Sequence, residues 1–217
     1  MEAVLYGRVS MNVLVLDLGV SNIRSLTSAL TYLGASHLVS DDPAMLGAAT
    51  HVILPGVGAF DPAMAMIGER SLADPLRAYV NDSKRPLLGV CLGMQLLCAG
   101  SDEGSLPGLG LMPGRFVKLE SYPGSPQKVP HVGFSPVYGY RETGLFKGLG
   151  PQSHFYFTHS YALPPIEPDG NAALCDHARP FVAGFQRENI CGVQFHPEKS
   201  QSAGLRLISN FLEATAA

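Results

Sequence analysis

The sequence predicts a single α/β domain in which a mostly parallel central sheet is flanked by helices and extended by a region of antiparallel strands. A chain of 217 residues is long enough to bury one sizeable core. The hydrophobic fraction of 46% and the charged fraction of 15% are typical of a compact enzyme. Strand-like apolar runs alternate with segments of helical spacing in the first half, which indicates parallel strands joined by right-handed crossovers.

The first half of the chain repeats this strand–helix pattern. A buried strand is predicted at 11–18. A helix follows at 22–33, and Gly34 ends it. The next predicted elements are a strand at 37–40, a short helix at 41–49, a strand at 51–54 that breaks at Pro55-Gly56, a helix at 74–81, and a strand at 85–90 that leads into another helix.

The second half has a different pattern. Residues 106–161 form short apolar runs broken by glycine and proline, which favours antiparallel strands and loops. Two strands at 181–186 and 190–195 are joined by a short turn, and a helix at 202–212 closes the fold. Residues 1–10 lack the apolar core and cleavage pattern of a secretory signal, so we expect a short N-terminal extension ahead of one domain at 11–217.

Composition excludes several classes of function. The net charge of −3 gives no reason to expect nucleic acid or an anionic membrane as a partner, and no apolar run approaches the length of a membrane span. Cys91, Cys98, Cys175 and Cys191 have neither Cys-x-x-Cys nor zinc-site spacing, and we expect a cytoplasmic protein without a metal. No dinucleotide or Walker-type glycine motif occurs, so no cofactor is expected.

Cys91 follows an apolar strand-like run and precedes a helix-like run, with Gly89 and Gly93 two residues to either side. This is the cysteine form of a strand–turn–helix nucleophile elbow. The tight turn places the nucleophile in an uncommon backbone conformation, and the glycines relieve the crowding. The helix N-terminus favours a thiolate. A lone cysteine is more often a small buried hydrophobe, but the glycines and the strand-to-helix change favour the nucleophile.

An acid/base for this thiolate is predicted far downstream, at His196. Glu198 follows two residues later and, in an extended segment kept out of a helix by Pro197, would lie on the same side of the backbone. The carboxylate would fix the imidazole tautomer while the other ring nitrogen faces the nucleophile. A surface His-Pro-Glu turn is the alternative, but together with the elbow the pattern predicts a Cys91–His196–Glu198 triad for acyl transfer.

The motifs Gly-Val-Cys-Leu-Gly-Met-Gln at 89–95 and Gln-Phe-His-Pro-Glu-Lys-Ser at 194–200 resemble those of the triad-type, or class I, glutamine amidotransferases. Pro-Gly-Val-Gly at 55–58, Val-Pro-His-Val-Gly at 129–133 and Thr-His-Ser-Tyr at 158–161 narrow the resemblance to the glutaminase subunits of imidazole glycerol phosphate synthase. The resemblance covers nearly the whole chain. It implies a class I glutamine amidotransferase fold and hydrolysis of glutamine through a cysteinyl thioester.

Thioester formation passes through an oxyanion that needs N–H donors. The amide of Leu92, directly after the nucleophile, is one candidate. The loop Gly56, Val57 and Gly58 leaves a strand without side-chain bulk, and the resemblance implies that it supplies the other donor. An ordinary glycine-rich turn is the alternative reading of this loop.

The resemblance further implies a glutamine-binding set, with Glu103 meeting the α-ammonium group. Its members are Gln95, Glu103, His159, Ser160 and Tyr161. A solvated loop carboxylate remains an alternative for Glu103, and a satisfied structural histidine remains one for His159.

The resemblance implies a partner as well, a (β/α)8-barrel cyclase that makes imidazole glycerol phosphate and aminoimidazole carboxamide ribonucleotide in histidine biosynthesis. Ammonia released into bulk water would be protonated, so a protected route to the cyclase is expected. Because the chain ends soon after its last predicted helix, we expect a heterodimer of separate polypeptides. Glutaminase turnover should be low without the partner.

Two departures from the family pattern fall near the expected partner face. Residues 17–22 read Asp-Leu-Gly-Val-Ser-Asn where the family has Asp-Tyr-Gly-x-Gly-Asn, and Phe134 replaces a tryptophan. We expect Asn22, Phe134 and Lys199 at this interface, with a solvated lysine as the alternative for Lys199.

Three rival functions remain. A glutaminase for anthranilate, GMP or carbamoyl phosphate synthesis is disfavoured because those families usually have Pro-Gly-Gly or Pro-Gly-Pro at 55–57. A stand-alone cysteine hydrolase of the same fold would act without a partner. A non-catalytic binding module is disfavoured because all three triad residues are present.

Overall fold

The structure, a computed structural model, describes residues 12–19, 23–120, 127–165 and 170–214. The predicted extension at 1–10 and the predicted interface residue Asn22 lie outside these ranges. The helices and strands are β1 (Val13–Leu16), α1 (Ile23–Tyr32), β2 (His37–Ser40), the 3-10 helix η1 (Pro43–Ala48), β3 (His51–Gly56), α2 (Phe60–Glu69), α3 (Ala73–Asn81), β4 (Leu87–Cys91), α4 (Leu92–Leu97), β5 (Gly100–Ser101), β6 (Arg115–Lys118), β7 (His131–Val137), η2 (Gly144–Phe146), β8 (Ser153–His159), β9 (Tyr161–Ala162), β10 (Asn171–His177), β11 (Arg179–Arg187), β12 (Ile190–Val193), η3 (Pro197–Lys199) and α5 (Gln201–Leu212).

Seven of the described strands form one sheet in the order β10-β11-β12-β4-β3-β1-β2. The five strands from β12 to β2 pair in parallel, whereas β10 and β11 join antiparallel at one edge. The mostly parallel sheet predicted from the sequence is therefore confirmed.

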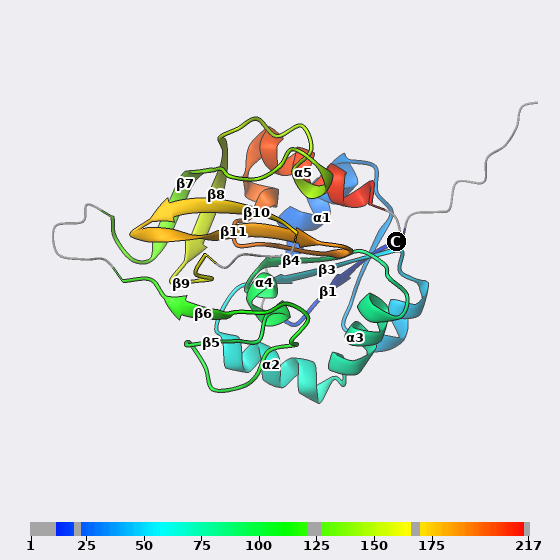
Figure 1. Cartoon of the computed structure of the whole chain (residues 1–217). Coiled ribbons are helices and arrows are strands. Elements are labelled where there is room, and N and C mark those ends of the chain that lie inside the picture. Colours follow the sequence, from blue (N-terminus) through cyan, green and yellow to red (C-terminus); the bar gives the residue numbers. More distant parts are fainter. Residues whose placement is uncertain (1–11, 20–22, 121–126, 166–169, 215–217) are drawn as a thin grey trace, which may run out of the picture.

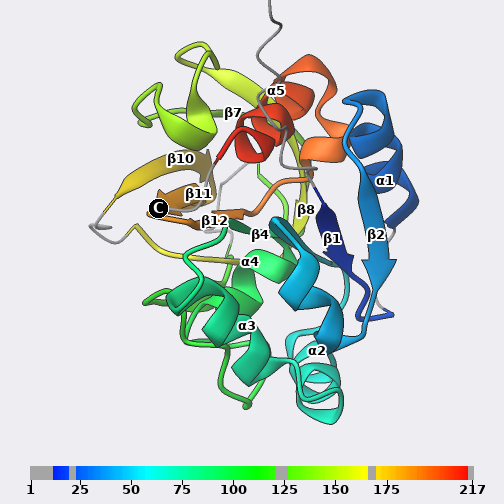
Figure 2. The same cartoon turned by 90° about the vertical axis from the view of Figure 1, so that its right-hand side faces the viewer.

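Helices cover both faces of this sheet, with α1 and α5 on one side and α2 and α3 on the other (Figures 1 and 2). One core joins Leu30 of α1 and Phe211 of α5 to Phe155 of β8. A second core joins Phe60 of α2 and Leu76 of α3 to the opposite face. Because β1, β3 and β4 are buried on both faces, they are continuous apolar runs in the sequence.

The antiparallel region predicted at 106–161 is present as two smaller sheets. β7 and β8 pair antiparallel along their whole length, from His131 opposite His159 to Val137 opposite Ser153. β6 pairs antiparallel with β9 and parallel with β5. Figure 1 shows β7 and β8 beside α5, on the α1 side of the main sheet.

Among the helices and strands that build the main sheet and its two faces, three differ from the sequence prediction. Helix α2 and strand β10 were not predicted, although Asp61-Pro62 in the first turn of α2 is a typical helix-start signal. β3 also continues through Pro55, where a break was predicted. The pairing of β3 with β1 ends at Ile53, so beyond this point only β4 is its neighbour and the missing N–H of Pro55 need not interrupt a ladder.

Strand order brings the predicted triad segments together at one edge of the sheet. Gly56 at the end of β3 is paired with Cys91 at the end of β4. β12 lies on the other side of β4, with Val193 opposite Val90, and the chain reaches His196 three residues later. The carboxyl ends of parallel strands are where α/β sheets bind ligands. Within the described ranges, no helix is both long and apolar enough to cross a membrane.

Candidate active site

Cys91 is the last residue of β4, and α4 begins at the next residue. Its φ of 54° and ψ of −110° place it in a conformation that costs a non-glycine residue about 1–3 kcal/mol. A Cβ on Gly93 would lie 1.7 Å from the Leu54 carbonyl oxygen, and one on Gly89 would lie 2.7 Å from the Met94 nitrogen. The strand–turn–helix geometry predicted for this segment is present, and both glycines are needed for its close packing.

The Cys91 sulfur lies in a buried polar environment, with 5% of the residue exposed. The thiol donates to the Thr158 carbonyl oxygen at 3.9 Å, and Gln194 Nε2 donates to Sγ at 3.6 Å. Gln194 is in turn oriented by Gln95, whose Nε2 donates to Gln194 Oε1 at 3.4 Å. Sequence reasoning assigned no role to Thr158 or Gln194. The signal for Gln194 was its place at the start of the motif at 194–200, as an amide in an apolar run.

His196 and Glu198 form the predicted contact. His196 Nδ1 lies 2.8 Å from Glu198 Oε1, and the two side chains are only 4% and 6% exposed. The local backbone is not the extended segment that the sequence predicted. Residues Pro197–Lys199 form a 3-10 turn that His196 caps with φ −98° and ψ 97°. This turn, rather than strand alternation, folds the carboxylate back towards the imidazole.

The second ring nitrogen of His196, Nε2, is buried and has no hydrogen-bond partner among the described residues. Burial, the largest single influence, lowers the pKa of His196, but the proximity and charge of Cys91 and the hydrogen bond and charge of Glu198 outweigh it and raise the pKa to about 9. Cys91 thus acts on the imidazole although the sulfur makes no regular hydrogen bond with Nε2. The environment favours an imidazolium with one nitrogen oriented by Glu198 and the other available for proton transfer.

A cavity of about 270 Å³ opens at Cys91. It is lined by Val57, Gly58, Cys91, Leu92, Gln95, Glu103, Pro130, Thr158, His159, Ser160 and Tyr161. The structure therefore brings the whole predicted glutamine-binding set and most of the predicted oxyanion residues to one small cavity. Gly56 is not part of the lining, because it packs behind the elbow, where a Cβ would lie 2.9 Å from Leu92 Cβ. Gly58 has a φ of +118°, a conformation that favours glycine.

Two of these residues present polar groups suited to a small polar ligand. The Oε1 atom of Gln95 is buried without a partner among the described residues, so it can accept a hydrogen bond from a bound molecule. Glu103 is half-buried rather than freely solvated, and its Oε2 accepts from the Phe60 amide at 3.0 Å. Desolvation is the main influence that raises the pKa of Glu103.

The side chain of His159 has the bonding of a satisfied structural histidine. Its Nδ1 lies 2.8 Å from the Tyr161 carbonyl oxygen, which requires an N–H there, and its Nε2 lies 3.0 Å from His131 Nδ1. His131 Nε2 then accepts from the Ser135 hydroxyl at 2.8 Å. Burial lowers the pKa of His159 to about 4 and that of His131 to about 3, so both rings are neutral at neutral pH.

Two of the three predicted partner residues lie on one surface. Phe134 on β7 is 49% exposed, and its ring packs on Tyr156 of β8 with centroids 5.5 Å apart. Lys199 Nζ lies 5.7 Å from the centre of the same Tyr156 ring. Val132, two residues before Phe134 and on the same face of β7, is 58% exposed. These four residues form an apolar patch with one cation, which we call the β7–β8 patch.

No group of three or more His, Cys, Asp or Glu side chains with the arrangement of a metal site is found in the described part of the chain.

Comparison with known proteins extends these observations. A family model described as glutamine amidotransferase class-I matches residues 14–215. The imidazole glycerol phosphate synthase subunit HisH of Synechococcus elongatus is 42% identical over 205 residues, covering 94% of this chain and 93% of the relative. Subunit HisH 2 of Pseudomonas aeruginosa is 40% identical over 201 residues, covering 93% of this chain and 98% of the relative.

Solved structures support the fold. One named as a glutamine amidotransferase has a TM-score of 0.72 at 21% identity, covering 93% of this chain and 97% of that one. A glutamine amidotransferase from Thermotoga maritima has a TM-score of 0.61 at 15% identity, covering 95% of this chain and 100% of that one. The chain belongs to the glutamine amidotransferase class-I family and, within it, to the family of HisH subunits of imidazole glycerol phosphate synthase.

Proposed function

We propose that this chain is the glutaminase subunit of imidazole glycerol phosphate synthase, which hydrolyses glutamine to glutamate and ammonia and passes the ammonia to a separate cyclase subunit. The observation that supports it most is the position of Cys91, which lines a small cavity together with the predicted glutamine-binding residues and also raises the pKa of His196, the partner of Glu198. The names of relatives that are 40–42% identical over nearly the whole chain support the same reaction.

In the first half-reaction, the Cys91 thiolate attacks the side-chain amide carbonyl of glutamine, and a carbon–sulfur bond forms. The tetrahedral oxyanion accepts hydrogen bonds from the Leu92 amide and from the loop at 56–58. The carbon–nitrogen bond then breaks, and His196 Nε2 gives its proton to the leaving ammonia. The pKa of about 9 keeps His196 protonated and ready for this step at neutral pH.

In the second half-reaction, His196 takes a proton from water, and the hydroxide attacks the glutamyl thioester. The carbon–sulfur bond breaks, glutamate leaves, and the Cys91 thiolate is restored. Gln194 Nε2, which donates to Sγ, stabilises negative charge on the sulfur in both halves. Glu198 stabilises the imidazolium form of His196 without taking its proton.

The acceptor of the ammonia is a (β/α)8-barrel cyclase that forms a heterodimer with this chain and makes imidazole glycerol phosphate and aminoimidazole carboxamide ribonucleotide. The relatives of similar length are named subunits, which supports a second polypeptide. Ammonia is mostly protonated in neutral water and is then not a nucleophile, so a closed route between the two sites would keep it reactive. The β7–β8 patch, which includes Lys199, supplies an exposed surface for the cyclase.

We place the enzyme in the cytoplasm. All four cysteines are unpaired, as expected in a reducing compartment.

The test is to mix the purified chain with barrel cyclase and follow glutamine-dependent formation of imidazole glycerol phosphate. We expect little glutamate release by the chain alone, a large increase with the cyclase, and no turnover by the Cys91→Ala variant in the same complex. Product formation only with an anthranilate, GMP or carbamoyl phosphate synthase would assign a different acceptor. Full activity on γ-glutamyl conjugates without any partner would instead support a stand-alone hydrolase.

A further inference from the structure

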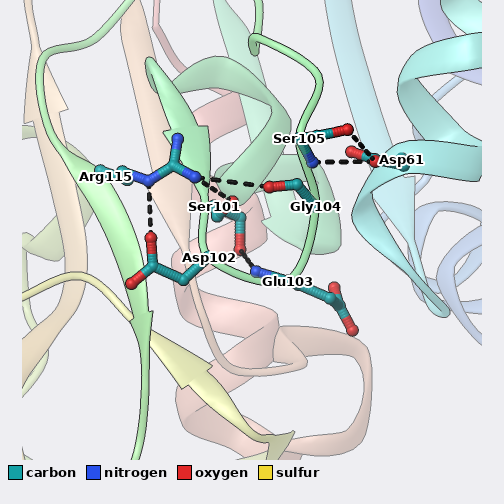
Figure 3. Close-up of polar contacts among 7 residues, drawn as sticks. All are labelled: Asp61, Ser101, Asp102, Glu103, Gly104, Ser105 and Arg115. Atoms are coloured by element: carbon teal, nitrogen blue, oxygen red, sulfur yellow. Dashed lines mark hydrogen bonds and ion pairs between the residues drawn. The ribbon is translucent and has the colours of Figure 1, made fainter.

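Two segments that are distant in sequence are joined by hydrogen bonds beside the cavity. One is the start of α2, which directly follows the oxyanion loop, and the other is the turn at 101–106, which follows α4. Asp61 Oδ2 accepts from the Ser105 amide at 2.9 Å and from the Ser105 hydroxyl at 3.1 Å. Asp61 Oδ1 accepts from the Leu106 amide at 3.0 Å. Figure 3 shows Asp61 and Ser105 pointing towards one another.

A hydrogen bond whose donor lies on α2 and whose acceptor lies on the turn completes the connection. Glu103, from the turn, accepts the Phe60 amide proton at the start of α2. Each segment therefore contributes one carboxylate that binds main-chain N–H groups of the other. We call this reciprocal arrangement of Asp61, Phe60, Glu103, Ser105 and Leu106 the α2–turn clamp.

The turn is braced from its other side as well. Arg115 Nη2 donates to the Ser101 carbonyl oxygen at 2.8 Å, and its Nε donates to Asp102 Oδ1 at 2.6 Å (Figure 3). Ser101 Oγ accepts from the Glu103 amide at 3.2 Å. A Cβ on Gly104 would lie 1.9 Å from Asp61 Oδ1, so a side chain at that position would displace the Asp61 carboxylate from the turn. The backbone on both sides of Glu103 is thus fixed.

The clamp connects groups that line the cavity, although Asp61 itself is not part of the lining. Glu103, Val57 and Gly58 all line the cavity, and Phe60 follows Gly58 by two residues. The distance between the Glu103 carboxylate and the oxyanion loop is therefore set by the bonds between α2 and the turn. A group that holds one end of a substrate and a group that stabilises charge at its other end must keep a fixed separation.

An ordinary helix cap does not account for this geometry. Asp61 lies in the first turn of α2, where a carboxylate interacts favourably with the helix N-terminus. Both of its oxygens, however, are bound to Ser105 and Leu106, and these N–H donors lower the pKa of Asp61. The amide of Phe60 is bound by Glu103 instead. Each carboxylate thus binds main-chain N–H groups of the other segment and not those of its own segment.

We propose that Asp61 is a positioning residue for glutamine: through Ser105 and Leu106 it sets where the Glu103 carboxylate stands relative to the oxyanion loop at 56–58. This inference rests on the proposed function. It assigns Asp61 and Ser105 an effect on both glutamine affinity and thioester formation without contact to the substrate.

The experiment measures kcat and KM for glutamine in the complex with the cyclase. The variants are Asp61→Ala, Asp61→Asn and Ser105→Ala, with Asp74→Asn as the matched control. Asp74 also lies in the first turn of a helix, α3, and among the described residues its only ion-pair partner is Arg77 on that helix, at 3.0 Å. Hydrogen exchange of the backbone segment at 57–61 gives a readout that does not depend on turnover.

We expect Asp61→Ala to lower kcat/KM at least about tenfold, with a higher KM from the displaced Glu103 and a lower kcat from the displaced loop. Asp61→Asn should lose less, because its amide oxygen can still accept from Leu106. Ser105→Ala, which removes only the hydroxyl bond, should lose least. Exchange at 57–61 should be faster in Asp61→Ala than in Asp74→Asn.

The inference fails if Asp61→Ala matches Asp74→Asn within about twofold in both kcat and KM, whether or not its melting temperature falls. If Asp61→Ala does not fold, the same comparison is made with Asp61→Asn and Ser105→Ala, and equality with the control again overturns it. A wild-type complex that turns over while the variants match the control rejects the inference alone. A wild-type complex without any turnover rejects the proposed function and the inference together.

Discussion

At the scale of single residues, the candidate site depends on how closely the backbone packs around Cys91. Cys91 ends its strand with a positive φ. The helix that follows packs so closely against β3 that Gly93 lies directly against the Leu54 carbonyl oxygen. A glycine is needed there because of space, since no positive φ occurs at Gly93. Stability and nucleophile placement therefore depend on the same contact.

Replacing Gly93 with alanine should destabilise the protein by about 1–3 kcal/mol or more, because the new Cβ overlaps a main-chain oxygen that cannot move freely. Gly68 in α2 is the matched control, since a Cβ built there meets no atom within 4 Å in the described part of the chain, apart from its neighbours and the backbone of its own helix. Gly68→Ala should be neutral or stabilising by about 0.5–1 kcal/mol. Urea unfolding of the three proteins measures both effects. Equal stability of Gly93→Ala and wild type would show that the elbow is less closely packed than described.

Replacing Glu198 with glutamine should change the pH dependence of glutamine hydrolysis. The wild-type kcat/KM should fall as pH rises through about 9, where His196 loses the proton that the leaving ammonia needs. Glu198→Gln removes a group that raises this pKa, so the alkaline limb should move to lower pH and kcat should fall at least about 10²-fold. The exposed Glu69→Gln variant serves as the control. An alkaline limb at the same pH in wild type and Glu198→Gln would contradict this account of the pair.

At the scale of elements, the β7–β8 hairpin connects the exposed patch to the cavity. The chain of hydrogen bonds from Ser135 through His131 and His159 to the Tyr161 carbonyl crosses both strands. His131 is also stacked between Phe157 and His177, with ring centroids 4.6 and 3.9 Å away. This arrangement requires that both His131 and His159 are neutral. The stability of the β7–β8 hairpin therefore depends on pH, although the hairpin contains no catalytic group.

The free energy of unfolding should therefore fall as pH decreases below about 6.5. There the unfolded chain binds protons at His131 and His159, whereas the folded chain keeps both neutral down to about pH 3 and 4. Each histidine contributes a slope of up to about 1.4 kcal/mol per pH unit. His131→Asn keeps a donor for His159 and removes one titrating group, so its slope between pH 6.5 and 5 should be smaller.

Urea unfolding at a series of pH values measures these slopes. The exposed His154 on β8 provides the control, because His154→Asn should retain the wild-type slope. An identical slope in His131→Asn and wild type would contradict the prediction that the buried ring resists protonation.

At the scale of the whole molecule, the exposed surface beside the site should govern association with the cyclase. Phe134→Ala should weaken the complex at least about tenfold if this ring is one of the few interface residues whose truncation costs about 2 kcal/mol or more, a group in which aromatic side chains are enriched. Tyr32→Ala, at the end of α1 and 77% exposed, removes a comparable ring elsewhere. Titration of glutaminase activity with cyclase gives both affinities. Equal affinities of the two variants would remove the β7–β8 patch from the interface.

The sequence predicted the features that depend on local pattern. The elbow around Cys91 and the contact of His196 with Glu198 follow from short motifs, and the parallel sheet follows from apolar runs. The 3-10 turn after His196 was not predicted, because a His-Pro-Glu segment fits either an extended or a turn backbone.

Features that depend on tertiary contact could not be predicted in this way. Gln194 and Thr158 meet the Cys91 sulfur only because β12 and β8 converge on β4. The bonds of Asp61 to Ser105 and Leu106 join segments more than 40 positions apart, and no spacing in the sequence encodes them. Strand order places these groups, and a single sequence does not fix strand order.

Covalent trapping with a diazoketone analogue of glutamine, followed by peptide mass spectrometry of the chain in complex with the cyclase, tests the nucleophile most directly. The account predicts one adduct, on Cys91, that excess glutamine prevents. Cys98, Cys175 and Cys191 should remain unmodified, because burial raises the pKa of each thiol to about 12. An unmodified Cys91, or equal modification of all four cysteines, would contradict the proposed glutaminase mechanism.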